Sequence, residues 1–195
     1  LADFVPMVKG TSSMALAGPP LVKAVIGEDI SAEDLGGSKV HCEISGVGDL
    51  EVADDKECLR VVKEYLSFFP QNCGEKPPRQ AGGGLEFEEA ADDHVDESIL
   101  KILPDSPKRP YDMHEIVKRL VDHGRFLEIK PAFARNILTG FGRFCGNPMG
   151  IVANQPMVMG GVLDVDSSDK AARFINLCDA FNIPLLFLQD VPGFM

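Results

Sequence analysis

A short, wholly apolar segment near the end of the chain constrains the fold more than any other feature. Leu185-Leu186-Phe187-Leu188 has no polar residue, which is typical of a parallel strand buried on both faces. The segment before it, opened by Asp166-Ser167-Ser168, places its apolar residues on one helical face, and residues 149–154 are typical of a strand. Strand, helix and buried strand in this order predict a βαβ unit, and therefore the α/β fold class.

A stretch rich in proline and glycine divides the chain in two. Residues 70–110 hold six prolines, the run Gly82-Gly83-Gly84 and an acidic run over residues 86–97. This composition predicts a linker or a long surface excursion, and the acidic run is more typical of a solvated face than of a metal site. Helices are expected at residues 21–26, from Ser31, after Asp54 or Asp55 and from Asp112 to Val121, and strands at residues 4–8, 12–17, 126–129 and 136–144.

Charge and cysteine content narrow the classes of function. The formal net charge of −11 argues against broad binding to nucleic acid or to anionic membranes, so an anionic ligand would need a local group of Lys or Arg. No apolar run approaches the roughly 20 residues of a membrane span. The five scattered cysteines form no CxxC pair, which favours buried free thiols in a reducing compartment over metal or redox chemistry.

Both ends of the chain have the features of a cut polypeptide. The sequence opens without an initiator Met or a signal peptide, and it stops directly after the loop that follows the apolar strand. We therefore expect a fragment of a longer subunit.

Side-chain catalysis has little support in the sequence, whereas one glycine loop could do chemistry with its backbone. The four histidines show no metal-binding spacing, and neither a GxSxG elbow nor a nucleotide-phosphate motif is present. Asp190-Val191-Pro192-Gly193-Phe194 lies beyond the carboxyl end of the apolar strand, where open α/β folds bind ligands. Backbone N–H groups fixed there could stabilise an oxyanion by roughly 3 kcal/mol per donor, although a plain structural turn explains the loop equally well.

Several separated blocks extend across nearly the whole chain outside residues 71–107. They include Val8-Lys9-Gly10-Thr11-Ser12-Ser13, Gly27-Glu28-Asp29-Ile30, Arg109-Pro110-Tyr111-Asp112, Lys170-Ala171-Ala172-Arg173-Phe174-Ile175 and Cys178-Asp179-Ala180-Phe181-Asn182-Ile183-Pro184. In this order and spacing, the blocks resemble the carboxyltransferase (beta) subunits of biotin-dependent acyl-CoA carboxylases, the family of propionyl-CoA, methylcrotonyl-CoA and acetyl-CoA carboxylases.

The resemblance implies a crotonase-like (ClpP/crotonase) α/β fold containing parts of two repeated domains. Residues 1–75 would be the C-terminal part of the first domain, on the acyl-CoA side, and residues 110–195 the N-terminal part of the second, on the biotin side. Residues 76–109 would link them. The resemblance also implies biotin carried by a biotin carboxylase or biotin carboxyl carrier partner, acyl-CoA as substrate and no metal. It further implies a hexamer, no nucleic-acid or membrane partner, and localisation in the bacterial cytoplasm or the mitochondrial matrix.

The mechanism that the resemblance implies needs no protein base. Carboxybiotin gives up CO₂, the biotin anion takes the α-proton of the acyl thioester, and the resulting enolate attacks CO₂. Glycine-rich loops stabilise both oxyanions, and the family's two main loops would lie before Leu1 and beyond Met195. Gly193 and Phe194 resemble the first half of the biotin-side oxyanion site. The acyl-CoA side would be shaped by Gly10, Ser12, Ser13, Gly18 and Pro19, while Lys9, Lys23 and Lys39 either meet CoA phosphates or are ordinary surface lysines.

The substrate and the direction of the reaction stay open at this point. Gly18-Pro19-Pro20-Leu21-Val22-Lys23 and Leu186-Phe187-Leu188-Gln189 are more similar to the methylcrotonyl branch. Asp190-Val191-Pro192-Gly193-Phe194 and Asn154-Gln155-Pro156 are more similar to the propionyl branch. Transfer could be to the α carbon or to a vinylogous γ carbon. The alternatives are a transcarboxylase or a decarboxylase of a carboxyacyl-CoA with the same fold, and a non-catalytic acyl-CoA-binding fragment.

Overall fold

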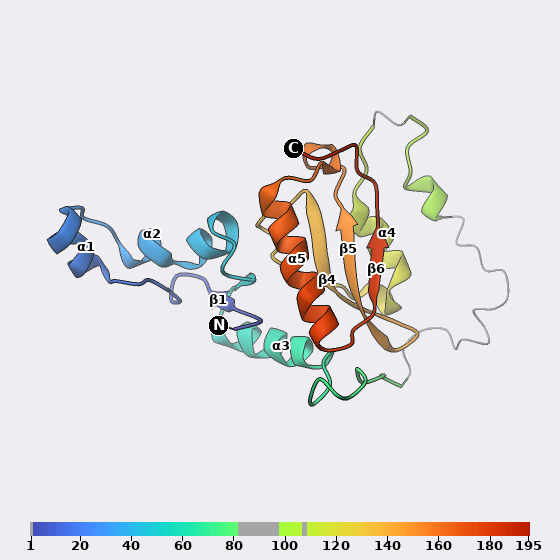
Figure 1. Cartoon of the computed structure of the whole chain (residues 1–195), viewed down its shortest axis with the longest axis horizontal. Coiled ribbons are helices and arrows are strands. Elements are labelled where there is room, and N and C mark those ends of the chain that lie inside the picture. Colours follow the sequence, from blue (N-terminus) through green and yellow to red (C-terminus); the bar gives the residue numbers. More distant parts are fainter. Residues whose placement is uncertain (1, 82–97, 107–108) are drawn as a thin grey trace. The chain divides into compact units, whose positions relative to one another are not determined.

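The chain divides into two compact units in a computed structural model that describes residues 2–81, 98–106 and 109–195 (Figure 1). The first unit comprises Leu1–Glu64 with Lys130–Phe133, and the second comprises Tyr65–Ile129 with Ala134–Met195. The predicted glycine run, the acidic run and His94 lie outside the described residues.

The first unit contains a pair of parallel strands connected by short helices. β1 (Pro6–Val8) pairs with β2 (Leu50–Val52), so that Met7 lies opposite Glu51. Between the strands come α1 (Pro19–Ile26), α2 (Ala32–Gly36) and the π-helical turn η1 (Val40–Ile44), and α3 (Asp55–Leu66) follows β2. Met7 and Cys42 are buried in the core of this unit.

Buried charges fix the start of the strand pair in the first unit. The Asp49 carboxylate accepts a hydrogen bond from the Val5 N–H at 2.7 Å and forms an ion pair with Lys130 at 2.8 Å. The Lys130 ammonium also donates to the Gly46 carbonyl. Both members of the pair are buried, so each depends on the other for compensation of its lost hydration.

The helix boundaries in the first unit confirm the capping patterns. Gly27 ends α1 with φ of 80°, and the Ser31 hydroxyl accepts from the Asp34 N–H at 3.0 Å. Asp54 caps α3 by accepting from the Glu57 N–H at 2.8 Å. These side chains satisfy donors that the first turn of a helix leaves free.

The strand predicted for residues 12–17 does not form. Only Ser13 makes an isolated bridge, to Gly37, and the chain turns at Gly10, whose φ is 71°. The Ser12 hydroxyl accepts from the Val8 N–H at 2.9 Å. A serine side chain that bonds the nearby backbone competes with a strand ladder, which explains the wrong prediction.

The second unit contains a four-stranded sheet with helices on both faces (Figure 1). Its strand order is β3-β4-β5-β6, with antiparallel pairing from β3 to β5 and parallel pairing of β5 with β6. The strands are β3 (Leu127–Ile129), β4 (Ile137–Phe144), β5 (Asn147–Asn154) and β6 (Leu185–Leu188). The helices are α4 (Met113–Leu120) and α5 (Val165–Ala180), with the short turns η2 (Ile99–Lys101), η3 (Asp122–Gly124) and η4 (Met159–Gly161). The crossover from β5 through α5 to β6 confirms the predicted βαβ unit.

Alternate residues of the central strands supply the two cores of the second unit. On the α4 face, Val117 packs with Leu138 and Ile151. On the α5 face, the ring of Phe141 lies 4.9 Å from that of Phe174. A Cβ on Gly150 would lie only 2.6 Å from the Cys178 sulfur, so a glycine here lets α5 approach the sheet closely.

A buried arginine attaches the segment after α3 to the β4–β5 hairpin. Arg143 donates to the carbonyl oxygens of Ser67 at 2.6 Å, Pro78 at 2.9 Å and Gly146 at 3.1 Å. Burial of the guanidinium lowers the pKa of Arg143, although the nearby Asp122 carboxylate raises it. Part of the proline-rich stretch is therefore bonded to the sheet of the second unit.

Two details of the predicted βαβ unit are wrong. Asp164, rather than Asp166, caps α5, through a reciprocal capping box with Ser167. β6 is not buried on both faces among the described residues, because it lies at the edge of the sheet and Phe187 is 57% exposed. Leu186 and Leu188 pack against the core on the α4 face. An apolar segment indicates that its side chains are to be buried, but it does not tell whether the strand has a neighbouring strand on each side.

The five cysteines are free, as predicted, but they are not all buried. Cys42, Cys145 and Cys178 are buried, whereas Cys73 is exposed. Burial raises the pKa of the Cys178 thiol to about 12, which keeps it protonated and unreactive.

Candidate functional site

The loops that follow β5 and β6 meet at the carboxyl ends of these two strands in the second unit. Because the two strands are parallel neighbours, their carboxyl ends lie on the same side of the sheet, where α/β folds bind their ligands. The segment after β6 runs beside Leu163, whose N–H donates to the Gly193 carbonyl at 3.2 Å. The Met195 N–H donates in turn to the Leu163 carbonyl at 2.9 Å, so that Phe194 and Leu163 form a parallel bridge.

This bridge fixes the direction of one backbone donor. In a trans peptide unit the C=O and the following N–H point in opposite directions, and the peptide bonds of the described residues are all trans. Because the Gly193 carbonyl faces Leu163, the Phe194 N–H must face away from it. A Cβ on Gly193 would have no described atom within 4 Å beyond its chain neighbours, and the Phe194 side chain is 78% exposed. The Phe194 N–H therefore points away from Leu163, on a residue that is itself exposed.

A buried asparagine joins the two loops. Asn154, the last residue of β5, donates from its amide to the Gly161 carbonyl at 2.9 Å and accepts from the Asp190 N–H at 3.3 Å. A Cβ on Gly161 would lie 2.9 Å from the Asp190 carbonyl oxygen, and Gly161 has φ of 76°. Only glycine meets both conditions without strain.

A tyrosine reaches the same loop from the start of α4. The Tyr111 hydroxyl donates to the Asp190 carboxylate at 2.8 Å. Burial, and then the hydrogen bond to the Asp190 carboxylate, raise the pKa of Tyr111 to about 12. The hydroxyl therefore keeps its proton, and remains a donor, at neutral pH.

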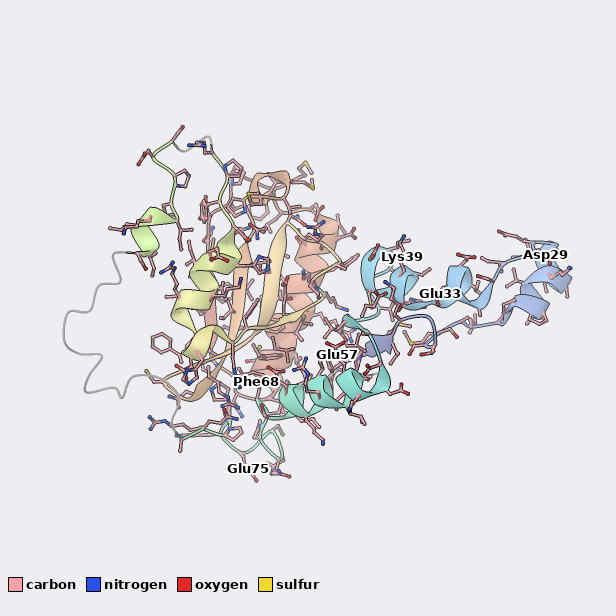
Figure 2. All side chains as sticks on the ribbon, turned by 180° about the vertical axis from the view of Figure 1, so that it is seen from behind. Asp29, Glu33, Lys39, Glu57, Phe68 and Glu75 are labelled. Atoms are coloured by element: carbon pink, nitrogen blue, oxygen red, sulfur yellow. The ribbon has the colours of Figure 1, made fainter. Side chains whose placement is uncertain are left out.

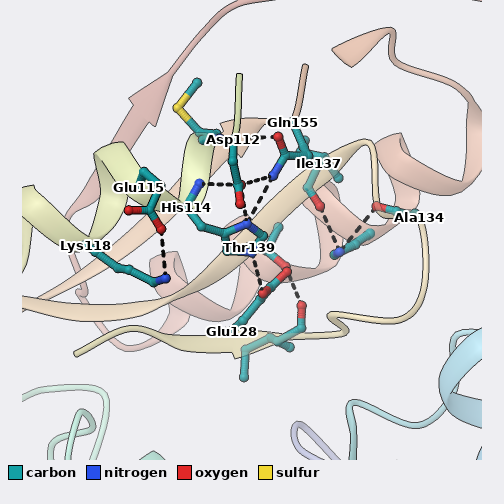
Figure 3. A network of polar contacts seen from close by, with 12 residues as sticks. Asp112, His114, Glu115, Lys118, Glu128, Ala134, Ile137, Thr139 and Gln155 are labelled. Carbon is teal, nitrogen blue, oxygen red and sulfur yellow. Dashed lines mark hydrogen bonds and ion pairs between the residues drawn. The ribbon is translucent and has the colours of Figure 1, made fainter. Parts of the chain in front are cut away.

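Next to Tyr111, a polar network ties the start of α4 to the end of β5 (Figure 3). The Gln155 amide donates to Asp112 at 2.7 Å, and its oxygen accepts from the Met113 N–H at 3.2 Å. Asp112 also caps α4 by accepting from the His114 N–H at 3.0 Å. Burial raises the pKa of Asp112, but hydrogen bonds from Gln155 and His114 outweigh this effect and hold it below its usual range.

His114 carries positive charge in this network. Its ring nitrogens lie 2.7 Å from the Asp112 carboxylate and 2.9 Å from the Glu128 carboxylate. The bond to Glu128 contributes most to raising the pKa of His114 to about 8, with Asp112 adding to it and burial opposing it. A ring that donates to two carboxylates must hold both protons.

The residues expected on the acyl-CoA side all lie in the first unit, in two places. Gly10, Ser12 and Ser13 follow β1 in one turn. Gly18 is the N-cap of α1 and Pro19 its first residue, while Lys23 forms an exposed ion pair with Asp29 at 2.7 Å.

The two other expected lysines lie near one carboxylate of the first unit. Lys9 forms an ion pair with Glu51 at 3.3 Å. A hydrogen bond from the Ser38 hydroxyl, and then the charges of Lys9 and Lys39, lower the pKa of Glu51. Lys39 lies just before η1, and Glu33 lies on α2 (Figure 2). Pairs as exposed as these bind weakly, so the ammonium groups can exchange partners.

Comparison with known proteins assigns the chain to a family. The sequence pattern described as the carboxyl transferase domain matches residues 1–195. The chain belongs to the carboxyl transferase domain family. It is 49% identical, over 197 residues, to the propionyl-CoA carboxylase beta chain of Saccharopolyspora erythraea, covering 100% of this chain and 36% of that protein. It is 44% identical, over 195 residues, to the methylmalonyl-CoA decarboxylase subunit alpha of Veillonella parvula, covering 100% of this chain and 37% of that protein.

A solved structure supports the same assignment of the carboxyl transferase domain. Transcarboxylase 12S, described as a hexamer assembly with methylmalonyl-CoA and methylmalonic acid bound, superposes with a TM-score of 0.91 at 41% identity. The match covers 99% of this chain and 36% of that one, so the chain spans just over a third of the length of these relatives. The crotonase-like α/β fold implied by the resemblance is confirmed. Among the described residues, no helix is long and apolar enough to cross a membrane.

Sequence reasoning found the glycine loop but missed the residues that hold it. In the sequence, Asn154 stands out only within the segment Asn154-Gln155-Pro156, and Tyr111 only within Arg109-Pro110-Tyr111-Asp112, both of which resemble the family. The pair Gly160-Gly161 was the one available signal. Consecutive glycines before a capped helix indicate a place where another chain segment approaches the backbone closely.

Proposed function

We propose that this chain belongs to the carboxyltransferase of a biotin-dependent acyl-CoA carboxylase. The enzyme would move the carboxyl group of carboxybiotin to the α carbon, or to a vinylogous γ carbon, of a short acyl-CoA by way of an enolate. The observation that carries the proposal is the fixed direction of the Phe194 N–H, on an exposed residue at the strand-end loop of a carboxyl transferase domain.

Backbone donors suit this reaction because charge develops on oxygen atoms. Biotin, carried on a partner subunit or domain, would supply the carboxyl group, and negative charge would develop on its ureido oxygen. The Phe194 N–H would donate to that oxygen, and the glycine at position 193 leaves room for its approach. A fixed donor aimed at developing charge contributes roughly 3 kcal/mol.

We also propose that the two parts of the chain serve different substrates. Residues 1–75 would form part of the acyl-CoA side, residues 76–109 a connection, and residues 110–195 part of the biotin side. Gly10, Ser12, Ser13, Gly18, Pro19 and Lys23 would contact acyl-CoA. The protein carries a net charge of −11, so CoA phosphates would need local cations, and the exposed Lys9, Lys23 and Lys39 are the lysines of the first unit proposed for this role.

The proposed acyl substrate is propionyl-CoA, with methylmalonyl-CoA as product. Two of the relatives described above are named for propionyl-CoA or methylmalonyl-CoA, and the transcarboxylase structure is described with methylmalonyl-CoA bound. Carboxylation at the α carbon connects these two compounds. The partner would be a biotin carboxylase or biotin carboxyl carrier subunit. Self-association into a hexamer is supported by the transcarboxylase relative, whose description names a hexamer assembly.

A second candidate is a transcarboxylase or a decarboxylase of a carboxyacyl-CoA. It is favoured by the 44% identity to a methylmalonyl-CoA decarboxylase subunit and the 41% identity to transcarboxylase 12S. The oxyanion requirement is the same in all three reactions, so this site does not discriminate among them. A non-catalytic acyl-CoA-binding fragment is a third candidate, which CoA binding without any carboxyl transfer would favour.

The test is incorporation of labelled bicarbonate by the complete native complex with ATP, using acetyl-, propionyl- and methylcrotonyl-CoA with and without avidin. We expect incorporation into propionyl-CoA that avidin abolishes. Absence of incorporation by an intact, biotin-loaded complex would overturn the carboxylase proposal. Release of CO₂ from methylmalonyl-CoA, or carboxyl transfer to a keto acid without ATP, would establish the second candidate instead.

A further inference from the structure

We infer that Tyr111 and Asn154 are positioning residues, which set the direction of the Phe194 N–H by holding Asp190 from two sides. The inference deepens the proposed function and rests on it. Both residues would act through the backbone of the loop between Asp190 and Phe194.

The loop needs such anchors because of where it starts. Asp190 is exposed and follows β6, the strand at the edge of the sheet. The far end of the loop is tied to Leu163 by two backbone hydrogen bonds. The near end is tied through Asp190, whose N–H donates to Asn154 at 3.3 Å and whose carboxylate accepts from Tyr111 at 2.8 Å.

The two anchors belong to one closed ring of contacts. Tyr111 precedes Asp112, which accepts from Gln155 at 2.7 Å, and Gln155 follows Asn154. Asn154 accepts from the Asp190 N–H, and Asp190 accepts from the Tyr111 hydroxyl, which closes the ring. Three hydrogen bonds thus connect three chain segments. A ring of this kind restricts each member more than a single bond does.

The ring is mounted on rigid parts of the second unit. Asn154 and Gln155 are 6% and 4% exposed; Asn154 is the last residue of the fully paired strand β5, and Gln155 follows it directly. Tyr111 packs against the core formed by α4 and the sheet. Asp190 is therefore an exposed residue held by two residues that are not free to move, which is the arrangement expected of a positioned loop.

Loss of an anchor should therefore act on the alignment of the donor rather than on its presence. Hydrogen bonds weaken steeply as the donor angle closes, and displacement of a catalytic group by about 1 Å can lower a rate by roughly 100-fold. Acyl-CoA binding should be spared because its proposed residues lie in the first unit. The expected signature is a loss of kcat without a rise in the KM for acyl-CoA.

The test compares Tyr111→Phe, Asp190→Ala and their double variant in the full-length subunit assembled with its partner. We expect each single variant to lower kcat about 10-fold, with the KM for acyl-CoA within twofold of wild type. The double variant should be no slower than Asp190→Ala alone, because the two substitutions remove the same hydrogen bond between Tyr111 and Asp190. Asp190→Asn keeps an oxygen acceptor for Tyr111 and should retain most of the activity.

Amide hydrogen exchange separates failure of this inference from failure of the proposed function. In Tyr111→Phe, the amides of Leu163 and Met195 should exchange faster than in wild type, whether or not the complex carboxylates anything. Unchanged exchange together with unchanged kcat would overturn the positioning role. Multiplicative losses in the double variant, or a rise in acyl-CoA KM at constant kcat, would overturn it as well.

Discussion

The candidate residues of the two units are held in different ways. In the second unit, the loop ending at Phe194 is held by the buried side chain of Asn154, by the Tyr111 hydroxyl and by backbone bonds to Leu163. In the first unit, none of the residues of α1 is buried, and Lys23 forms an exposed ion pair with Asp29. A backbone donor must be aimed by its surroundings, whereas a lysine on a flexible stem can find a phosphate by itself. We therefore expect substitutions in the second unit to lower kcat and substitutions in the first to raise KM.

The largest effect is expected from Gly161→Ala. The new methyl group would lie 2.9 Å from the Asp190 carbonyl oxygen, at a residue whose φ of 76° already disfavours a side chain. We expect kcat to fall by about 100-fold, because the loop must shift. Gly160→Ala is the matched control, since its φ is 65° but its Cβ would meet nothing within 4 Å among the described residues. Equal losses in steady-state kcat for the two variants would show that the Asp190 contact is irrelevant.

Lys130→Met should produce the largest loss of stability in the first unit. It leaves the Asp49 carboxylate buried without its ion-pair partner, which costs about 3–5 kcal/mol. Denaturant unfolding of the full-length subunit would measure the change. The double variant Lys130→Met with Asp49→Leu should recover part of this loss. If the single variant unfolds at the wild-type midpoint, the pair does not hold the strands of the first unit together.

A pH effect on stability is expected in the second unit. The pKa of His114 is raised from 6.5 to about 8, so its charged form is favoured in the folded state. Its contribution is complete below about pH 6.5 and is lost as pH rises through 8, amounting to about 1–2 kcal/mol. Melting temperature measured from pH 6 to 9.5 should fall across this window. The same scan on His114→Gln should lose this step, and a step that persists would come from another group.

The smallest effect is expected from Lys23→Ala. The lysine is exposed, and its pair with Asp29 is solvated, so an acyl-CoA phosphate would gain little from it alone. We expect the KM for acyl-CoA to rise about 2–3-fold at low salt, with kcat unchanged. Lys63→Ala, on an exposed part of α3, is the matched control. A fall in kcat with constant KM would place Lys23 outside the acyl-CoA side.

Most local features of the fold followed from the sequence, whereas long-range ones did not. Ser31, Asp54 and Asp112 were predicted as caps because a cap and its donor lie within three residues. The βαβ unit followed from hydrophobic periodicity. The strand expected at residues 12–17 was wrong, because a serine hydroxyl bound the backbone that a ladder would have used.

Only part of the candidate site could be predicted from the sequence, because contacts between distant residues leave no local pattern. The loop at Gly193 could be recognised because its residues are contiguous. The bond between Tyr111 and Asp190 joins residues 79 positions apart, and no local pattern records which two distant polar groups will meet. The edge position of β6 depends likewise on pairing that its own apolar residues do not encode.

The most direct test of the central claim removes a single N–H group. An ester in place of the peptide bond before Phe194 deletes that donor and keeps the side chain and the bond from Met195 to Leu163, while the Gly193 carbonyl becomes a weaker acceptor for the Leu163 N–H. In the full-length subunit assembled with its partner, we predict that kcat for carboxyl transfer falls by about 100-fold, equivalent to roughly 3 kcal/mol, with the KM for acyl-CoA unchanged. A kcat equal to that of the subunit prepared by the same route with a normal peptide bond would contradict the account.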